Sequence, residues 1–264
     1  MLHNAGGTIV VALVAAWVAA GTAQAAIHTE TVPYTYGGVT YNGYLAYDDA
    51  LKGPLPGVLV FHEWWGLNDY AKMRARKVAE LGYVAFAADM YGGGVTTTNP
   101  DEAGKLSGAL RDKPEGREIA KAALGVLAKN PLVDAKRIAA IGYCFGGSVA
   151  LELAYSGADL AGVVTFHAGL TTPKPDEMKS VKARFLICHG ANDTFESPED
   201  IAKFQEAMRT GGYDWQMIYF GGAVHSFTNP DADKFGMKGI AYNKLADERS
   251  WEYMKIFLAG VFAK

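Results

Sequence analysis

A glycine-rich hexapeptide, GYCFGG at positions 142–147, places a cysteine where it could act as a nucleophile. It follows the apolar run Arg137 to Ile141, which predicts a strand, and it leads into a predicted helix from Gly147 to Tyr155. A residue at the tip of such a strand-to-helix turn has strained backbone, so its neighbours two positions away must be small. The N-terminus of the helix favours the reactive thiolate. We therefore predict a nucleophile elbow at Cys144; the alternative is a small buried thiol.

A nucleophile of this kind needs a base and a residue that orients the base. Downstream of the elbow, Asp193 follows one predicted strand and His225 follows the next. The order nucleophile, acid, histidine is that of α/β-hydrolases. Both residues are expected at the carboxyl ends of parallel strands, where ligands bind in open sheets. Read singly, Asp193 could be a turn or cap residue and His225 a solvated loop residue.

The elements that would position these side chains alternate between strands and helices. Short apolar runs predict strands and longer amphipathic runs predict helices, which together indicate a mostly parallel sheet with helices on both faces. The predicted strands include 39–49, 58–61, 83–89, 137–141, 161–167, 183–190 and 214–222, and the predicted helices 69–82, 117–131, 147–155, 197–212 and 242–262. The segment Val95 to Lys105 is expected to be an irregular surface excursion. We expect one α/β domain over residues 26–264.

Composition and charge exclude several classes of protein. Of the 264 residues, 50% are hydrophobic and 20% are charged, which excludes a disordered chain. The net charge of −3 argues against nucleic-acid binding, because it provides no excess of positive charge for the phosphates. Two cysteines are too few for a disulfide scaffold or a four-cysteine zinc site. His62-Glu63 does not begin an H-E-x-x-H zinc motif, because position 66 is glycine.

The N-terminal segment has the features of an export signal. Thr8 to Ala20 is almost wholly apolar but shorter than a membrane-spanning helix, and Ala23 and Ala25 form an A-x-A cleavage pattern. We predict a signal peptide over residues 1–25 and a periplasmic or secreted mature protein that is not membrane-bound after cleavage. An uncleaved anchor or a buried N-terminal helix is the alternative, because the first residues contain no lysine or arginine.

With cysteine in the elbow and Glu63 after an earlier strand, the chain resembles the dienelactone hydrolase family. The resemblance runs from about Val32 to the C-terminus. The matching pieces are VLVFHEWWGLND, YVAFAADMYGG, IGYCFGGSVAL, ICHGANDTF, GGAVHSF and YNKLADERSWEYM. It implies an α/β-hydrolase sheet of about seven to eight strands, a Cys144–Asp193–His225 triad, and a carboxylate, Glu63, that pairs with the thiol at rest.

The resemblance also implies an oxyanion hole and a substrate class. The oxyanion donors would be the backbone amides of Phe145 and Trp64, the substrate an ester or lactone, and neither metal nor organic cofactor would be required. Two arginines that bind the substrate carboxylate in family members would fall at Gly93 and near Asn229, which carry no positive charge.

Without those arginines, a mainly neutral aromatic pocket is expected instead. Trp64 could take part in it, and Trp65, Tyr91 and Phe227 are its predicted substrate-binding residues. Core packing is the alternative role for these aromatic side chains.

Two other functions remain open from the sequence. The chain could be a non-catalytic ligand-binding module on a hydrolase scaffold, since fold does not fix function. It could also be a thiol redox protein that uses Cys144 and Cys188, although it has no C-x-x-C motif. A disulfide between these two cysteines is possible in an oxidising compartment.

Overall fold

The computed structural model describes residues 26–263 together with Met1. The predicted signal segment 1–25 and its cleavage site therefore lie outside the described residues, apart from Met1. Within the described part, no helix has both the length and the apolar character required to cross a bilayer.

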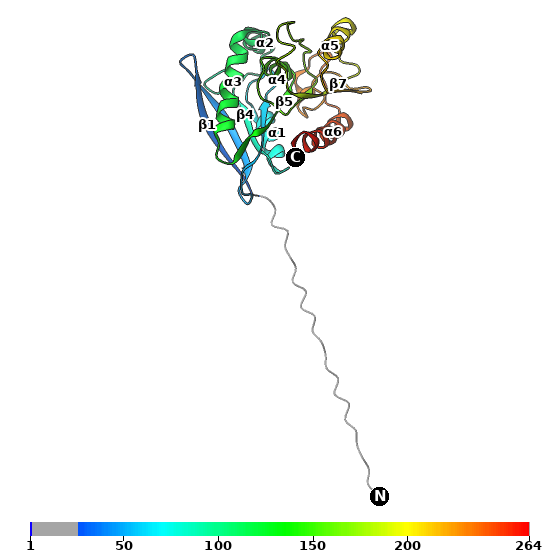
Figure 1. Ribbon diagram of the computed structural model, residues 1–264. Helices are drawn as coiled ribbons and strands as arrows, with labels where there is room; N and C mark the ends of the chain where they lie inside the picture. The colour runs from blue at the N-terminus through cyan, green and yellow to red at the C-terminus, as the bar shows by residue number, and fades with distance from the viewer. Residues whose placement is uncertain (2–25, 264) are drawn as a thin grey trace.

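An eight-stranded sheet forms the centre of the molecule, and helices cover both of its faces (Figure 1). The strands are β1 (Ile27–Tyr36), β2 (Val39–Asp48), β3 (Leu55–Phe61), β4 (Val84–Ala88), β5 (Val133–Tyr143), β6 (Gly162–Phe166), β7 (Arg184–Gly190) and β8 (Trp215–Phe220). The helices are α1 (Asp69–Ala79), α2 (Pro100–Leu110), α3 (Pro114–Lys129), α4 (Phe145–Tyr155), α5 (Pro198–Thr210), α6 (Lys244–Phe262) and the short 3-10 helix η1 (Ala232–Phe235). The predicted α/β architecture is confirmed.

The strand order β1-β2-β4-β3-β5-β6-β7-β8 explains where a ligand could bind. β1 and β2 pair antiparallel, β2 pairs antiparallel with β4, and the remaining neighbours are parallel. The chain passes from β3 to β4 on one side, and β5 then lies on the other side of β3. This reversal leaves a crevice at the carboxyl ends of β3 and β5, the usual ligand site of such sheets.

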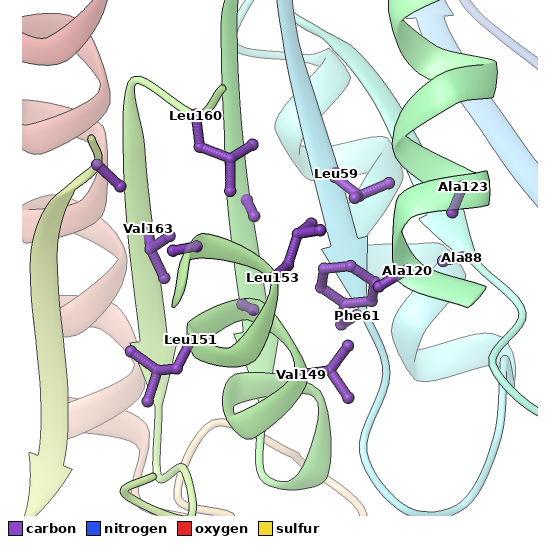
Figure 2. Packing of buried hydrophobic residues seen from close by; sticks show 14 of the residues in the cluster. Leu59, Phe61, Ala88, Ala120, Ala123, Val149, Leu151, Leu153, Leu160 and Val163 are labelled. Carbon is purple, nitrogen blue, oxygen red and sulfur yellow. The ribbon is translucent and has the colours of Figure 1, made fainter. Parts of the chain in front are cut away.

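Alternate residues of the central strands bury their side chains against different helices. Leu59 and Phe61 of β3 belong to a core cluster with residues of α3, α4 and α5, part of which Figure 2 shows. Val58 and Val60 belong to a second cluster with residues of α1 and α6. Because both faces are buried, the strand ends that carry the candidate site are held by packing on two sides.

Two elements differ from the predictions. The segment Val95 to Lys105 is not wholly irregular, because α2 begins at Pro100 and extends to Leu110. The side chain of Asn99 caps this helix by accepting hydrogen bonds from the backbone amides of Asp101 and Glu102. The N-terminal strand β1 was not predicted, because most of its side chains are exposed and it has no apolar run.

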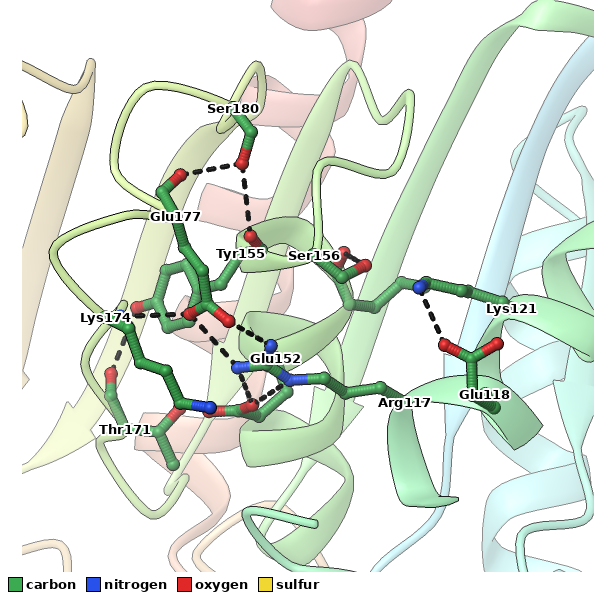
Figure 3. A network of polar contacts seen from close by, with 11 residues as sticks. Arg117, Glu118, Lys121, Glu152, Tyr155, Ser156, Thr171, Lys174, Glu177 and Ser180 are labelled. Carbon is green, nitrogen blue, oxygen red and sulfur yellow. Dashed lines mark hydrogen bonds and ion pairs between the residues drawn. The ribbon is translucent and has the colours of Figure 1, made fainter. Parts of the chain in front are cut away.

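A network of charged side chains fixes the long connection between β6 and β7. The guanidinium of Arg117 in α3 bonds both to Glu152 of α4 and to Glu177 in the connection (Figure 3). The three side chains are only 10% to 15% exposed. The connection is therefore tied to two helices on the same face of the sheet.

Candidate active site

Cys144 occupies a sharp turn between β5, which ends at Tyr143, and α4, which begins at Phe145. Its backbone dihedrals are φ 53° and ψ −119°, which few non-glycine residues adopt. The Cys144 amide donates a 3.0 Å hydrogen bond to the carbonyl of Phe166 at the end of β6, so the strained turn is held by the sheet. Strain of this kind concentrates at functional sites.

Three glycines make this turn sterically possible. A Cβ on Gly142 would lie 2.0 Å from the carbonyl oxygen of Gly146, and one on Gly147 would lie 2.4 Å from the Cβ of Ala168. A Cβ on Gly146 would lie 2.4 Å from the carbonyl oxygen of Phe61. The last contact brings the start of α4 directly against the end of β3.

His225 and Asp193 lie together in the loops that follow β8 and β7. Asp193 Oδ2 is 2.8 Å from His225 Nδ1, and both residues are buried. The backbone on either side of the ring is fixed, because the His225 amide donates to Gly239 and its carbonyl accepts from Ala241. Asp193 can therefore hold the imidazole with its other nitrogen free to act on a thiol or a substrate.

The charges around His225 favour its protonated form. Burial alone would lower its pKa, but the negative charge of Cys144 and the hydrogen bonds to Asp193 and Cys144 outweigh burial and raise the pKa to about 10. The imidazole thus interacts with both the sulfur and the carboxylate. A positively charged ring in this position can donate a proton to a group bound beside the sulfur.

The predicted oxyanion donors, Phe145 and Trp64, both line the cavity that contains Cys144. Neither backbone amide donates to a carbonyl among the loop, turn and cap hydrogen bonds of the described residues. A Cβ on Gly146 would lie 2.4 Å from the carbonyl oxygen of Phe61 and 2.5 Å from that of His62, so the start of α4 packs against the end of β3. Two such amides can stabilise a negatively charged oxygen.

Glu63 is buried beside the candidate triad, with its carboxylate held by the loop that carries His225. Ser226 Oγ donates to Oε1 at 2.8 Å and Asn229 Nδ2 donates to Oε2 at 2.6 Å. Burial raises the pKa of Glu63, and these two hydrogen bonds oppose that effect. The implied pairing of Glu63 with Cys144 is therefore not the arrangement in this structure: both carboxylate oxygens bond elsewhere. Asn229, near which the resemblance would place an arginine of family members, thus donates to the carboxylate of Glu63.

A cavity of about 360 Å³ opens over the sulfur of Cys144. Its walls combine the candidate catalytic residues with residues of α2 and of the loop after Asp193. The lining consists of Trp64, Gly104, Ser107, Gly108, Arg111, Cys144, Phe145, Gly169, Phe195, Glu196, His225 and Ile240. The exposed surface of this lining is mostly apolar, which suits the neutral part of a small organic substrate.

The three predicted substrate-binding residues do not line this cavity. Trp65 is 2% exposed, and its ring stacks on Phe235 with centroids 4.2 Å apart. Phe227 is fully buried against Phe220. The Tyr91 hydroxyl donates a 2.9 Å hydrogen bond to the carbonyl of Trp64, so Tyr91 helps to fix the position of that lining residue. The pocket role predicted for them is corrected: Trp65 and Phe227 pack in the core, and the half-buried Tyr91 packs against it.

Two further buried histidines, His62 and His167, and the second cysteine lie outside the cavity lining. His62 accepts a hydrogen bond from the Met90 amide, and burial lowers its pKa to about 4, so the ring is neutral. His167 contacts Thr228, and its ring centroid is 5.3 Å from that of His225. Cys188 is buried within β7, and both cysteines are free thiols. The disulfide left open by the sequence is absent from the described residues.

Sequence reasoning missed the cavity residues contributed by α2 and by the loop after Asp193. For α2 a signal was present, because Asn99-Pro100-Asp101-Glu102 is a typical helix start. That signal predicts the helix but not its position over Cys144. For Phe195 and Glu196, adjacency to Asp193 was the only indication.

Comparison with known proteins places the chain in a family. The sequence profile described as the dienelactone hydrolase family matches residues 41–262. The protein belongs to the dienelactone hydrolase family. Within it, the chain is 29% identical over 205 residues to an Aquifex aeolicus protein named "Putative carboxymethylenebutenolidase", covering 76% of this chain and 87% of the relative.

Two solved structures resemble this dienelactone hydrolase family member along most of its length. One, described as m3DLH, is 43% identical with a TM-score of 0.87, covering 90% of this chain and 99% of the other. The second, a dienelactone hydrolase-like promiscuous phosphotriesterase from metagenomic libraries, is 40% identical with a TM-score of 0.87, covering 90% and 100%. The resemblance inferred from the motifs is thus confirmed at the level of family and fold.

Proposed function

We propose that this protein hydrolyses carboxylic esters or lactones with Cys144 as nucleophile. The observation that supports this most strongly is the conjunction of a strained cysteine with the 2.8 Å His225–Asp193 contact at the base of one cavity. The name of the Aquifex aeolicus relative agrees with this substrate class.

In the proposed first step, the Cys144 thiolate attacks the carbonyl carbon of the ester. The negative charge that develops on the carbonyl oxygen is stabilised by the amides of Phe145 and Trp64. His225, protonated in the resting ion pair, gives its proton to the leaving oxygen as the carbon–oxygen bond breaks. An alcohol departs and a thioester remains on Cys144.

In the second step, the neutral His225 removes a proton from water, and the resulting hydroxide attacks the thioester carbon. The carbon–sulfur bond then breaks, which releases the acid and restores the thiolate beside the imidazolium. Asp193 keeps the ring oriented through both steps.

The experiment that tests this proposal compares short p-nitrophenyl esters and a dienelactone as substrates for three forms of the protein. Cys144→Ala should lose at least about 10⁴-fold in kcat. Cys188→Ala is the matched control, because it removes the other cysteine from a strand outside the cavity, and it should retain turnover. Undiminished hydrolysis by Cys144→Ala would contradict the mechanism.

The proposal also separates the two functions that the sequence left open. A non-catalytic binding module would turn over no ester in any form and would leave Cys144 unlabelled by iodoacetamide. A redox protein would lose free thiols on mild oxidation and recover them on reduction. Ester hydrolysis with two titratable thiols is the result expected here.

A second activity is suggested by one of the similar structures. The 40% identical protein is described as a promiscuous phosphotriesterase, and the cavity here has a mostly apolar surface that suits a neutral triester. Attack of the same thiolate on phosphorus would release an alcohol or phenol and leave a phosphorylated Cys144. Release of p-nitrophenol from paraoxon, absent in Cys144→Ala, would support this activity; no release would contradict it.

We further propose that the chain is exported and cleaved after Ala25. The support is the apolar run and the A-x-A pattern in the sequence. N-terminal sequencing of protein from the exported fraction should begin at Ala26. Recovery of the full-length chain only from the cytoplasm would contradict the proposal.

A further inference from the structure

Two adjacent residues, Phe195 and Glu196, form one wall of the cavity beside His225. The ring of Phe195 lies with its centroid 4.7 Å from that of His225, yet Phe195 is 50% exposed. An exposed aromatic ring beside a candidate catalytic histidine is available for contact with a substrate. Both residues line the cavity.

The position of this wall is tied to the candidate triad. The Phe195 amide donates a 2.9 Å hydrogen bond to Asp193 Oδ1, while Asp193 Oδ2 holds His225. One carboxylate therefore fixes both the imidazole and the start of the wall.

Glu196 presents a partly buried carboxylate to the cavity. Gly169 is another lining residue, and a Cβ built on it would lie 3.6 Å from Glu196 Oε1. The carboxylate therefore lies close to the backbone of Gly169. Burial raises the pKa of Glu196, a hydrogen bond with the backbone of Leu170 opposes that effect, and the negative charges of Asp193 and Asp200 add to the effect of burial. Among the described residues it forms no ion pair. A cation in the cavity would compensate this desolvated carboxylate.

The lining also includes a basic side chain, on another part of the wall. Arg111, at the end of α2, lies close enough to Tyr91 to lower the pKa of its hydroxyl, against the larger effect of burial, which raises it. The positive charge of His225, by contrast, lowers the pKa of Glu196. Arg111 is thus associated with Tyr91, whereas the carboxylate of Glu196 lies on the side of the cavity that carries His225.

Proton transfer decides which part of a substrate faces this wall. His225 must protonate the leaving oxygen, so the leaving alcohol has to lie on the His225 side of the cavity. An aromatic ring next to a carboxylate is a combination that binds organic cations. We infer that Phe195 and Glu196 form the subsite for the leaving alcohol and select alcohols that carry a positive charge. This inference rests on the proposed ester hydrolysis.

The test uses two butyrate esters that differ in one atom of the alcohol. One carries a 2-(trimethylammonio)ethyl group and the other its neutral counterpart, 3,3-dimethylbutyl. The measured quantity is the ratio of kcat/KM for the cationic ester to that for the neutral ester, in wild-type protein and in variants. Because each variant is compared with wild type, the different intrinsic reactivities of the two esters cancel. Glu196→Gln should lower this ratio about tenfold.

The matched control is Glu199→Gln, which removes an equal charge from the exposed first turn of α5, outside the cavity lining. It should change the ratio less than about twofold, since exposed charges are screened. Phe195→Leu, which keeps an apolar side chain but removes the ring, should lower the ratio about threefold. An unchanged ratio in Glu196→Gln, with both esters hydrolysed, would overturn the inference. Absence of all ester hydrolysis in wild-type protein would instead overturn the proposed function.

Discussion

The base and the wall of the candidate site are built in different ways. The base consists of Glu63, Trp64, Cys144, Asp193 and His225, which follow the carboxyl ends of the strands β3, β5, β7 and β8. The wall consists of residues of α2 and of the loop after Asp193, on the exposed side of the cavity. The base is held by hydrogen bonds and close backbone contacts, whereas the wall residues Phe195 and Arg111 are exposed.

This difference indicates a division between chemistry and selection. Residues fixed by a two-sided core can hold catalytic geometry to a fraction of an ångström. Exposed side chains on a loop and a short helix can change without disturbing that core. Substitutions in the base should therefore change the rate for every substrate, and substitutions in the wall should change the relative rates of different substrates.

Among substitutions that keep the nucleophile, the largest effect is expected for Asp193→Asn. The amide cannot hold the same imidazole tautomer, so kcat should fall about 10³- to 10⁴-fold for all esters by a similar factor. Steady-state kinetics on a neutral and a cationic ester measure this directly. Asp233→Asn, an exposed change in η1, is the control and should leave kcat unaltered. A loss confined to one ester would contradict the assignment of Asp193 to the base.

A loss of about 10²-fold in kcat is expected for Gly146→Ala. The added Cβ would lie 2.4 Å from the carbonyl oxygen of Phe61 and push the start of α4 away from β3, which separates the two oxyanion donors. Gly125→Ala is the matched control, because a Cβ there meets nothing within 4 Å. Activity of folded Gly146→Ala equal to that of wild type would show that the close contact does not position these donors.

The protonation of His225 provides a test that does not depend on a substrate. In wild-type protein, NMR of the labelled ring should show imidazolium that is lost as pH rises through about 10. Cys144→Ser removes the negative sulfur that raises this pKa, while burial, which lowers it, remains. The midpoint should therefore move to lower pH in the variant. An identical midpoint in both proteins would contradict the ion pair.

The smallest effect on chemistry, with a clear effect on stability, is expected for Arg117→Gln. Its partners Glu152 and Glu177 would be left partly buried without a cation, so the free energy of unfolding should fall by about 2 kcal/mol. Lys121→Gln breaks the exposed Lys121–Glu118 pair and should cost less than about 0.5 kcal/mol. Urea denaturation measures both. Equal effects would show that burial of the network contributes nothing.

The sequence was sufficient to predict the base more fully than the wall. The elbow could be predicted because its requirements are local: glycines 142 and 146 flank Cys144 and a predicted strand precedes it. The contact of Asp193 with His225 could be anticipated because successive parallel strands end at one edge.

The partners of Glu63 could not be predicted, because they depend on contacts between distant parts of the chain. Ser226 and Asn229 are separated from it by 163 and 166 positions. The burial of Trp65 also depends on a distant residue, Phe235, and no local pattern distinguishes a ring that faces a cavity from one that faces the core. Side-chain direction on a loop, as at Glu196, is set by packing rather than by spacing.

Trapping the reaction intermediate tests the central claim most directly. Protein mixed with an excess of p-nitrophenyl butyrate, quenched with acid within the first turnovers and digested, should yield the peptide that contains Cys144 with the added mass of one butyryl group. The same treatment should leave the peptide that contains Cys188 unmodified. Rapid turnover with no acyl group on Cys144 at any quench time, or an acyl group carried only by another residue, would contradict the account.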